Sequence, residues 1–530
     1  MDRRKFLQIS AVVSSTLGSE VMAAPKGKAA FTVVEAQVAD LQTAMASGKL
    51  TSKALTQLYL ARIKAIDKGG PRINSVIELN PDALKVAAGL DKERKLGKVR
   101  GPLHGIPVLI KDNIATADRM QTTAGSIALI GTKPPRDAFV VTKLREAGAV
   151  IIGKTNLSEW SNMRSTRSTS GWSSRGGLTR NPYALDRNTS GSSAGSGASI
   201  AASLAAVAIG TETDGSITSP ASINGLVGIK PTVGLVSRAG IIPISHSQDT
   251  AGPMARTVAD AAALLTALAG TDVRDSATSD ASMKAVDYTK HLDREALKGA
   301  RLGVVKSQFG GRNDLVTAEI EKALEVLKAQ GATLVELPEL PNSNKYGRSE
   351  YDVLLYELKA DLAAYFADYA PDSPIKTLAD IIAFNDKHKT KVMPHFGQEH
   401  MLRAQEKGGL DSKEYLDAVA NNLKFSREEG IDKALIENKL DALIAPSSSP
   451  AWLTDFIRGD NGGSGFASPA AVAGYPHITV PAGFVKGLPC GISFVGTAWS
   501  EARLIALAYA FEQATKHRRS PAFAKTVNVW

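Results

Sequence analysis

Short apolar runs that alternate with helical segments are the feature that most limits how this chain can fold. Six such runs occupy residues 108–110, 150–152, 302–305, 443–445, 478–480 and 492–495. A strand that is apolar along its whole length is buried on both faces, and the helical segments between the runs can supply the cover. The pattern therefore predicts an α/β fold in which helices enclose a buried sheet.

One stretch, from about residue 345 to 440, departs from this pattern because its charge density rises. Its apolar residues recur at helical spacing, at Tyr351, Leu355, Leu358, Leu362 and Tyr365. We interpret the stretch as a helical insertion or cap within one domain that spans residues 25–530, since the chain has no internal repeat and no low-complexity linker. A cap over a site commonly sets the choice of substrate.

The first 24 residues have the composition of an export signal. Arg3-Arg4-Lys5 precedes an apolar stretch at residues 9–18, and Val21-Met22-Ala23-Ala24 offers small residues for cleavage. The apolar stretch is too short to span a bilayer. Because paired arginines are typical of the twin-arginine route, residues 1–24 are predicted to be a signal peptide and the protein to be periplasmic. Without a functional signal the protein would remain cytoplasmic.

The charge distribution limits the classes of partner, and the cysteine content limits the covalent chemistry. The net charge is +10, and removing residues 1–24, which carry a net +1, would leave +9. Basic and acidic residues are interspersed, so we expect no nucleic-acid partner, and we expect no stable membrane insertion. The single cysteine, Cys490, excludes a disulfide within the chain and is interpreted as a small buried residue rather than a nucleophile. The oligomeric state stays open.

Two serines in glycine-rich surroundings are the candidates for chemistry. Ser192 lies in the Gly/Ser-rich stretch 191–197, and Ser216 follows the polar turn Thr213-Asp214-Gly215. Backbone N–H groups in such a turn can converge on one point, as an oxyanion hole beside a nucleophile requires. A serine hydroxyl is a weak nucleophile until a base takes its proton. We therefore predict that Ser216 needs a base from elsewhere in the chain.

Lys111 is the predicted base because it closes an apolar run. A lysine can replace histidine if burial keeps its amine neutral at working pH, and the end of an apolar strand favours such burial. Ser192 can then link the two, since one hydroxyl both accepts and donates a hydrogen bond. None of the eight histidines lies in a recognisable catalytic context. The three residues together predict a hydrolase of amide bonds.

Two other kinds of site are disfavoured. Residues 191–195 match the G-x-S-x-G nucleophile elbow, with Ser193 at its centre and His477 as the candidate histidine. That fold needs a strand directly before the serine, but the preceding sequence is typical of a loop. His395 and His400 do not have zinc-ligand spacing. The sequence predicts no metal and no cofactor.

Several ordered segments resemble the amidase signature hydrolases. The resemblance runs from about residue 35 to the C-terminus and is carried by residues 105–113, 191–197, 210–220, 228–232, 249–256, 473–476 and 480–483. It implies a single α/β/α layered domain around a large mixed, mostly parallel sheet. So many matches in the family's order make a chance likeness improbable.

By position, the resemblance assigns a role to each candidate. Ser216 would be the acylated nucleophile, Lys111 the general base, and Ser192 the bridging serine, joined to Gly191 by a cis peptide bond. The backbone amides of residues 213–216, that is Thr213, Asp214, Gly215 and Ser216, would line the oxyanion hole. No cofactor or metal takes part in this chemistry.

The chain departs from the family pattern around the nucleophile. Many members read Gly-Gly-Ser there and have an arginine two residues later, whereas this chain has Asp214-Gly215-Ser216 and Thr218. Glu212 is the acidic residue of that motif, and it therefore lacks the arginine with which the family pattern would pair it. The sequences of residues 210–216 and 170–177 are similar to those of bacterial peptide amidases, which remove ammonia from C-terminal peptide amides.

We therefore predict a serine amidase for linear amides, with a small-molecule or peptide amide as substrate. Three alternatives stay open. The first is the glutaminase-like A subunit of a tRNA-dependent amidotransferase, the second an esterase or carbamate hydrolase on the same fold, and the third a binding protein without activity.

Overall fold

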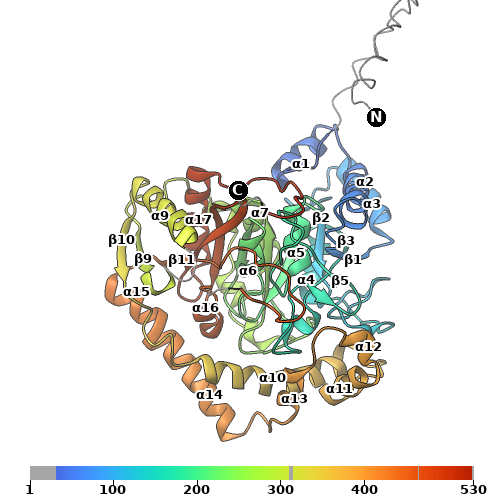
Figure 1. Ribbon diagram of the computed structural model, residues 1–530. Helices are drawn as coiled ribbons and strands as arrows, with labels where there is room; N and C mark the ends of the chain where they lie inside the picture. The colour runs from blue at the N-terminus through green and yellow to red at the C-terminus, as the bar shows by residue number, and fades with distance from the viewer. Residues whose placement is uncertain (1–30, 310–313, 463–464, 528–530) are drawn as a thin grey trace, which may run out of the picture. The chain divides into compact units, whose positions relative to one another are not determined.

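A computed structural model describes residues 31–309, 314–462 and 465–527 of the chain. The predicted signal peptide, residues 1–24, lies outside the described residues. The segment Val33–Trp530 forms one compact unit. Its core is a mixed sheet of eleven strands among the described residues, in the order β1-β3-β2-β6-β8-β7-β12-β13-β11-β9-β10 (Figure 1).

The strands are short, and most are buried along their whole length. Their bounds are β1 (Val76–Leu79), β2 (Pro107–Lys111), β3 (Val150–Thr155), β6 (Val207–Glu212), β7 (Val227–Lys230), β8 (Thr250–Ala255), β9 (Arg301–Val305), β10 (Thr333–Leu337), β11 (Ala442–Pro446), β12 (His477–Val485) and β13 (Leu488–Val495). A separate pair, β4 (Trp172–Ser173) and β5 (Gly177–Leu178), is antiparallel. The six predicted apolar runs lie within β2, β3, β9, β11, β12 and β13.

The large mixed sheet is confirmed, but the expectation that it is mostly parallel is wrong. Parallel pairs occur at β2–β3, β2–β6, β9–β10 and β9–β11. The other six pairs of the described sheet are antiparallel, namely β1–β3, β6–β8, β7–β8, β7–β12, β12–β13 and β11–β13. Apolar runs could not reveal this, because a strand covered on both faces is apolar throughout whichever way its neighbour runs.

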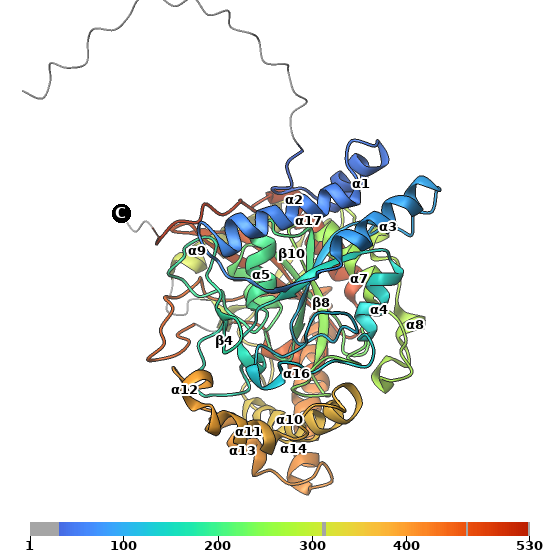
Figure 2. The same ribbon diagram turned by 90° about the vertical axis from the view of Figure 1, so that its right-hand side faces the viewer.

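Helices cover both faces of the sheet, as the layered fold requires (Figures 1 and 2). On one face, α7 (Val258–Leu268), α9 (Asp314–Ala329) and α17 (Glu501–Thr515) pack on β8, β12 and β13. On the other, α5 (Ala194–Ala201) and α6 (Thr218–Ile223) pack against each other and on β2, β6, β7 and β12. This arrangement confirms the α/β/α prediction.

The remaining helices of the main body follow local sequence signals. They are α1 (Val38–Ala46), α2 (Ser52–Arg62), α3 (Ala83–Lys95), α4 (Phe139–Glu146), α8 (Ala281–Lys284) and α16 (Ser468–Ala473). Helix α2 begins after Thr51, whose side chain accepts a hydrogen bond from the Ala54 N–H. Such a cap satisfies one of the free amides of the first turn.

Residues 347–438 carry a run of helices, and those within residues 347–423 gather at the lower edge of Figures 1 and 2. The helices of this run are α10 (Gly347–Tyr369), α11 (Leu378–Lys387), α12 (Lys389–Val392), α13 (Glu399–Gln405), α14 (Lys413–Leu423), a π-helix (Lys424–Ile431) and α15 (Asp432–Asn438). The long helix α10 buries Leu355, Leu358, Leu362 and Tyr365. It packs on α13 and α14, so its apolar face is used within this helical layer.

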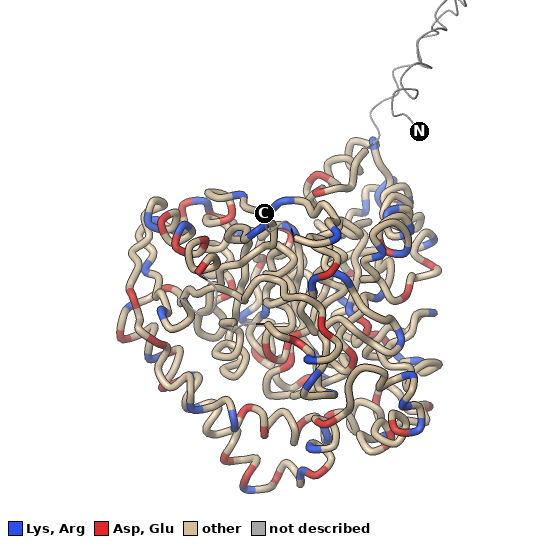
Figure 3. The backbone as a smooth tube through the Cα atoms, in the orientation of Figure 1, with Lys and Arg blue, Asp and Glu red and all other residues tan. Residues whose placement is uncertain are grey.

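The distribution of charged residues and the burial of the single cysteine are as the sequence analysis predicts. Basic and acidic residues are interspersed along the fold in Figure 3. Cys490 is buried in β13, and burial raises the pKa of its thiol to about 12, so it stays protonated. No helix within the described residues has the length and apolar character needed to cross a membrane.

Candidate active site

The candidate site lies where neighbouring parallel strands end. Strand β2 pairs in parallel with both β3 and β6, so the carboxyl ends of all three meet at one edge of the sheet. Lys111 is the last residue of β2, and Glu212 is the last residue of β6. Ser216 lies on the turn that joins β6 to α6, and Ser192 lies just before α5. The topology therefore gathers residues that are far apart in the chain.

Lys111 makes direct contact with Ser192. Its Nζ lies 2.7 Å from Ser192 Oγ, 2.8 Å from Thr211 Oγ1 and 3.3 Å from the Thr211 carbonyl oxygen. The lysine is fully buried. Burial lowers its pKa to about 7, although Asp249 and Glu212 act in the opposite direction. A substantial fraction of the amine is therefore neutral near neutral pH.

The partners of Lys111 leave its lone pair for the serine. A neutral amine has two N–H groups and one lone pair, and both oxygens of Thr211 can accept the two N–H groups. The lone pair can then accept a hydrogen bond from the Ser192 hydroxyl. Asn113 Nδ2 also donates to Thr211 Oγ1, over 3.0 Å, and fixes that side chain. Sequence reasoning missed Thr211, although it lies within the recognised segment 210–220.

The backbone around Ser192 has the expected unusual conformation. The Gly191–Ser192 peptide bond is cis, which confirms what the family resemblance implied. The Ser158 N–H donates to the Ser192 carbonyl oxygen over 3.0 Å. A Cβ at position 191 would overlap Ser158 Oγ, so the close approach of these two segments requires glycine.

Ser216 lies on the adjacent turn and keeps 8% of its surface exposed. The Ser193 N–H donates to the Ser216 carbonyl oxygen over 3.2 Å and joins the two serine segments. Gly215 precedes Ser216 with a φ of +77°, a conformation that favours glycine. Within the described part of the chain, the N–H groups of Gly215 and Ser216 have no acceptor. They are therefore available to a negatively charged oxygen.

Glu212 finds its partners on the turn itself. One of its carboxylate oxygens accepts hydrogen bonds from the Ile217 N–H over 2.7 Å and the Thr218 N–H over 2.8 Å. The Thr218 hydroxyl lies 3.2 Å from the same oxygen. Thr218, which stands where many family members have arginine, thus contributes to holding the acid. The carboxylate fixes the turn that carries Ser216.

The G-x-S-x-G serine is structural. Ser193 is fully buried, and its hydroxyl donates to the Thr211 carbonyl oxygen over 3.1 Å. The same hydroxyl accepts a hydrogen bond from the Thr211 N–H over 3.2 Å. His477 lies in β12 with its Nε2 2.5 Å from Ser493 Oγ, and burial lowers its pKa to about 3. Its hydrogen-bond partner is thus Ser493 rather than a nucleophile.

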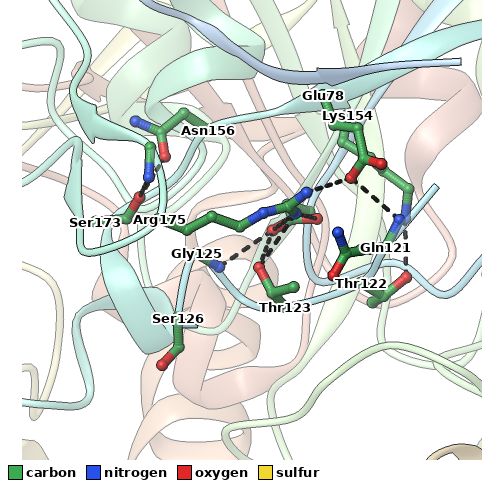
Figure 4. Close-up of polar contacts among 12 residues, drawn as sticks. Glu78, Gln121, Thr122, Thr123, Gly125, Ser126, Lys154, Asn156, Ser173 and Arg175 are labelled. Carbon is green, nitrogen blue, oxygen red and sulfur yellow. Dashed lines mark hydrogen bonds and ion pairs between the residues drawn. The ribbon is translucent and has the colours of Figure 1, made fainter. Parts of the chain in front are cut away.

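Two further lysines are buried near the site but have other partners. Burial lowers the pKa of Lys154 and that of Lys230 to about 8. Lys230 donates to the Pro231 carbonyl oxygen over 3.1 Å. Lys154 donates to the Ile114 carbonyl oxygen and to Thr122 Oγ1, in the polar network of Figure 4. Lys111 is thus the one that contacts Ser192.

The network in Figure 4 is arranged around Arg175. The Arg175 guanidinium contacts both carboxylate oxygens of Asp112 at 3.2 Å and pairs with Glu78 on its other side. Thr123 and Gly125 donate to the Asp112 carboxylate. Asp112 is fully buried next to Lys111 in sequence, and these donors compensate its charge.

One group of described side chains has metal-ligand composition. His246, Glu357 and Asp361 place ligand atoms within 4.8 Å of one another. His246 Nδ1 lies 2.9 Å from Asp361, and the Glu357 carboxylate accepts hydrogen bonds from Ser245, Ser247 and Tyr415. The hydrogen-bonding groups of these residues are therefore already paired with one another or with neighbouring hydroxyl groups. His395 stacks on Phe456, and His400 contacts Tyr351, so neither belongs to this group.

Comparisons with known proteins agree with this geometry. The family model described as Amidase matches residues 54–505. The crystal structure of native peptide amidase from Stenotrophomonas maltophilia is 53% identical, with a TM-score of 0.87, covering 92% of this chain and 99% of that one. A protein of Arabidopsis thaliana described as a probable amidase is 44% identical, over 93% of this chain and 92% of its own. The A subunit of the glutamyl-tRNA(Gln) amidotransferase of Halorhodospira halophila is 36% identical, over 91% and 98%.

Proposed function

The chain belongs to the amidase signature family and is a hydrolase of carbon–nitrogen bonds in amides, and we propose that it removes the terminal amide group of C-terminally amidated peptides. The observation that carries the chemistry is the contact between the buried Lys111 amine and Ser192, next to the turn of Ser216. The finer choice of substrate is supported by 53% identity to a peptide amidase over nearly the whole of that chain.

In the proposed mechanism, Ser216 is the nucleophile and neutral Lys111 is the base. Lys111 accepts the Ser192 proton while Ser192 accepts the Ser216 proton, and Ser216 Oγ attacks the amide carbonyl carbon. The free N–H groups of residues 215 and 216, with those of Thr213 and Asp214, stabilise the negative oxygen of the tetrahedral intermediate. Protonated Lys111 then returns a proton through Ser192 to the leaving nitrogen, and ammonia departs.

Water completes the cycle on the acyl-enzyme. The same relay takes a proton from water, the hydroxide attacks the ester carbonyl, and Ser216 leaves with the returned proton as the acid product is released. Every proton in this scheme moves between oxygen and nitrogen atoms of the chain, the substrate and water. The residues present therefore suffice for amide hydrolysis.

The test compares two serines that lie close together. We expect Ser216→Ala to lower kcat for ammonia release from N-acetylphenylalaninamide by about 10³-fold or more, because the nucleophile is lost. Ser193→Ala is the matched control, since among the described residues the Ser193 hydroxyl bonds to the backbone N–H and carbonyl oxygen of Thr211. A fluorophosphonate should label the Ser193→Ala protein but not the Ser216→Ala protein. Near-normal turnover by Ser216→Ala would refute the assignment.

The amidotransferase alternative predicts a different substrate. The amidotransferase relative from Halorhodospira halophila is 36% identical to this chain, which is lower than the 53% identity to the peptide amidase. A glutaminase-like subunit should release ammonia from free glutamine and co-purify with a partner. Ammonia release from a peptide amide without a partner, and none from glutamine, would separate the two functions.

We also propose that the protein is exported, on the basis of residues 1–24 alone. The paired Arg3-Arg4 and the apolar stretch after them support a twin-arginine signal. Cell fractionation of the full chain and of an Arg3→Lys, Arg4→Lys variant tests this. Amidase activity should move from the periplasmic to the cytoplasmic fraction in the variant, and equal distribution would contradict export by this route.

A further inference from the structure

The Asp214 side chain has no part in the mechanism above, although it lies two residues before Ser216. Many family members have glycine at this position, so the carboxylate is not required by the chemistry that the family shares. Ser468, at the start of α16, donates a hydrogen bond to Asp214 Oδ2 over 2.6 Å. Asp214 is half-buried, while Ser216 and Gly215 beside it are buried. A carboxylate that is partly removed from water, at a cost in free energy, thus lies next to the proposed nucleophile.

A second acid, from the helical layer, contacts Asp214. Glu350 on α10 is 8% exposed and shares a hydrogen bond between carboxyl groups with Asp214. Such a bond requires a proton. Burial raises the pKa of Asp214 to about 6 and that of Glu350 well above its ordinary value. The two neighbouring carboxyl groups therefore favour a state in which they share one proton and carry one negative charge between them.

Two buried polar atoms beside this pair have no partner among the described residues. Tyr346 is 2% exposed, and its hydroxyl is unpaired although its pKa is raised by burial and by the nearby Glu350 and Asp214. Gln248 donates to Glu350 over 3.1 Å and to the Thr213 carbonyl oxygen over 3.2 Å, but its Oε1 is unpaired. Unpaired buried polar groups are costly, so their presence beside a reactive serine points to a ligand.

We propose that Asp214, supported by Glu350 and Tyr346, forms the subsite that binds the peptide N–H group on the acyl side of the scissile amide. This inference rests on the proposed function and deepens it. On the acyl side of a peptide amide, the donor nearest to the reacting carbonyl is the N–H on the adjoining α carbon, and the Asp214 carboxylate can accept it. The Tyr346 hydroxyl can donate to the carbonyl oxygen of the same peptide group.

The shared proton explains how an acid is tolerated beside an oxyanion hole. Two charged carboxylates would repel the negative oxygen that forms on the substrate, whereas one proton shared between Asp214 and Glu350 limits the pair to one charge. The other charged groups that face Asp214 are Glu212 at the end of β6 and Lys230 at the end of β7. Asp214 is thus free to act as a hydrogen-bond acceptor for a neutral N–H group.

The test compares two substrates that differ in one methyl group. N-acetylphenylalaninamide carries the N–H, and its N-methyl analogue at that nitrogen does not. We expect the wild-type ratio of kcat/KM, N–H over N-methyl, to fall about tenfold or more in Asp214→Ala, as for loss of a hydrogen bond to a charged group. Asp368→Ala, an exposed acid of α10 that pairs with Arg136, is the matched control and should keep the wild-type ratio.

A second variant and the pH dependence guard against a merely structural effect. Asp214→Asn keeps the shape of the side chain but not its charge, so the ratio should fall and its pH dependence should vanish. In the wild type the ratio should rise with pH through about 6, because the ionised carboxylate is the better acceptor. The protonation of Lys111 affects both substrates equally and cancels in the ratio.

The inference is overturned if Asp214→Ala and Asp214→Asn keep the wild-type ratio, or if they slow both substrates equally. It is also overturned if the wild-type ratio is close to one. The proposed function fails by a different result, namely no ammonia release by the wild-type enzyme from N-acetylphenylalaninamide while simple amides are hydrolysed.

Discussion

Lys111 and Lys154 lie on neighbouring parallel strands and are both fully buried. Lys111 is the last residue of β2, and Lys154 pairs with Ile110, one residue before it. Burial lowers the pKa of both amines, to about 7 and about 8. On burial and pKa alone, the two lysines would be almost equal candidates for a base.

Their partners make them different. Lys154 donates to the Ile114 carbonyl oxygen and to Thr122 Oγ1, whose own proton points to the same carbonyl. Asp112 and Glu78 also favour its charged form. Lys111 instead has Ser192 Oγ at 2.7 Å, and Ser192 has a hydroxyl proton to give. Lys154 is therefore arranged as a donor and Lys111 as an acceptor.

The comparison shows that burial is necessary for a lysine base but does not select one. Desolvation makes the neutral amine accessible, whichever strand carries it. The position of the lone pair distinguishes the proposed base, because the two oxygens of Thr211 can accept the two N–H groups of Lys111. A catalytic assignment from pKa alone would not separate these lysines.

The largest effect should come from removing each amine. We expect Lys111→Met to lower kcat for amide hydrolysis by about 10³-fold or more, because the general base is lost. Lys154→Met, the matched control with the same change on the next strand, should lower kcat by less than about tenfold. Steady-state ammonia release measures both.

Circular dichroism and thermal melting should show that both variants are folded at the assay temperature. Equal losses of activity in the two folded proteins would contradict the distinction drawn between the lysines.

The pH profile sharpens the same comparison. Lys111 must be neutral to act, so log kcat/KM should fall with unit slope as pH drops below about 7, the pKa of this amine. The profile measured from about pH 5 to about pH 9 should keep this limb in Lys154→Met. An acid limb that disappears with Lys154, or a flat profile in the wild type, would exclude Lys111 as the base.

The candidate catalytic residues could be proposed from sequence because each lies within a short ordered motif. Ser192, Ser216 and Lys111 stand out through their glycine-rich or apolar surroundings, and the apolar runs marked six of the strands. The distinction between Lys111 and Lys154 could not be predicted. Lys111 is the last residue of a buried strand and Lys154 is the last but one, so only the three-dimensional position of Ser192 separates them.

Other features depend on contacts between distant segments. Glu350 is more than 130 positions from Asp214, and nothing in its helical surroundings marks it as a partner of the nucleophile turn. The prediction that the sheet is mostly parallel was wrong for a related reason. Strands β6 and β8 are both wholly buried, and yet they are antiparallel. The local sequence pattern indicates which residues are buried, whereas the direction and pairing of the strands depend on the whole fold.

A smaller effect should follow from changing Thr211, which aims the Lys111 lone pair. Thr211→Val removes the hydroxyl that accepts hydrogen bonds from Lys111 and Asn113, and we expect kcat to fall about tenfold because the buried hydrogen bond that orients the Lys111 amine is lost. The acid limb of the pH profile should also move. Thr155→Val is the control, because Thr155 is buried on β3 and bonds to Ser196 instead. The same loss in both variants would indicate a packing effect.

The smallest effect concerns the network around Lys154. Glu78→Gln removes one charge that pairs with Arg175, while Asp112 still holds the other side of the guanidinium. Because Glu78 and Arg175 are partly exposed, we expect the free energy of unfolding to fall by only about 1 kcal/mol. Denaturant unfolding measures this. The acid limb near pH 7 should stay in place, since Lys111 has Asp249 and Glu212 as its charged neighbours rather than Glu78. A shifted limb would mean that the two lysines are coupled through this network, and the separation between them would then have to be abandoned.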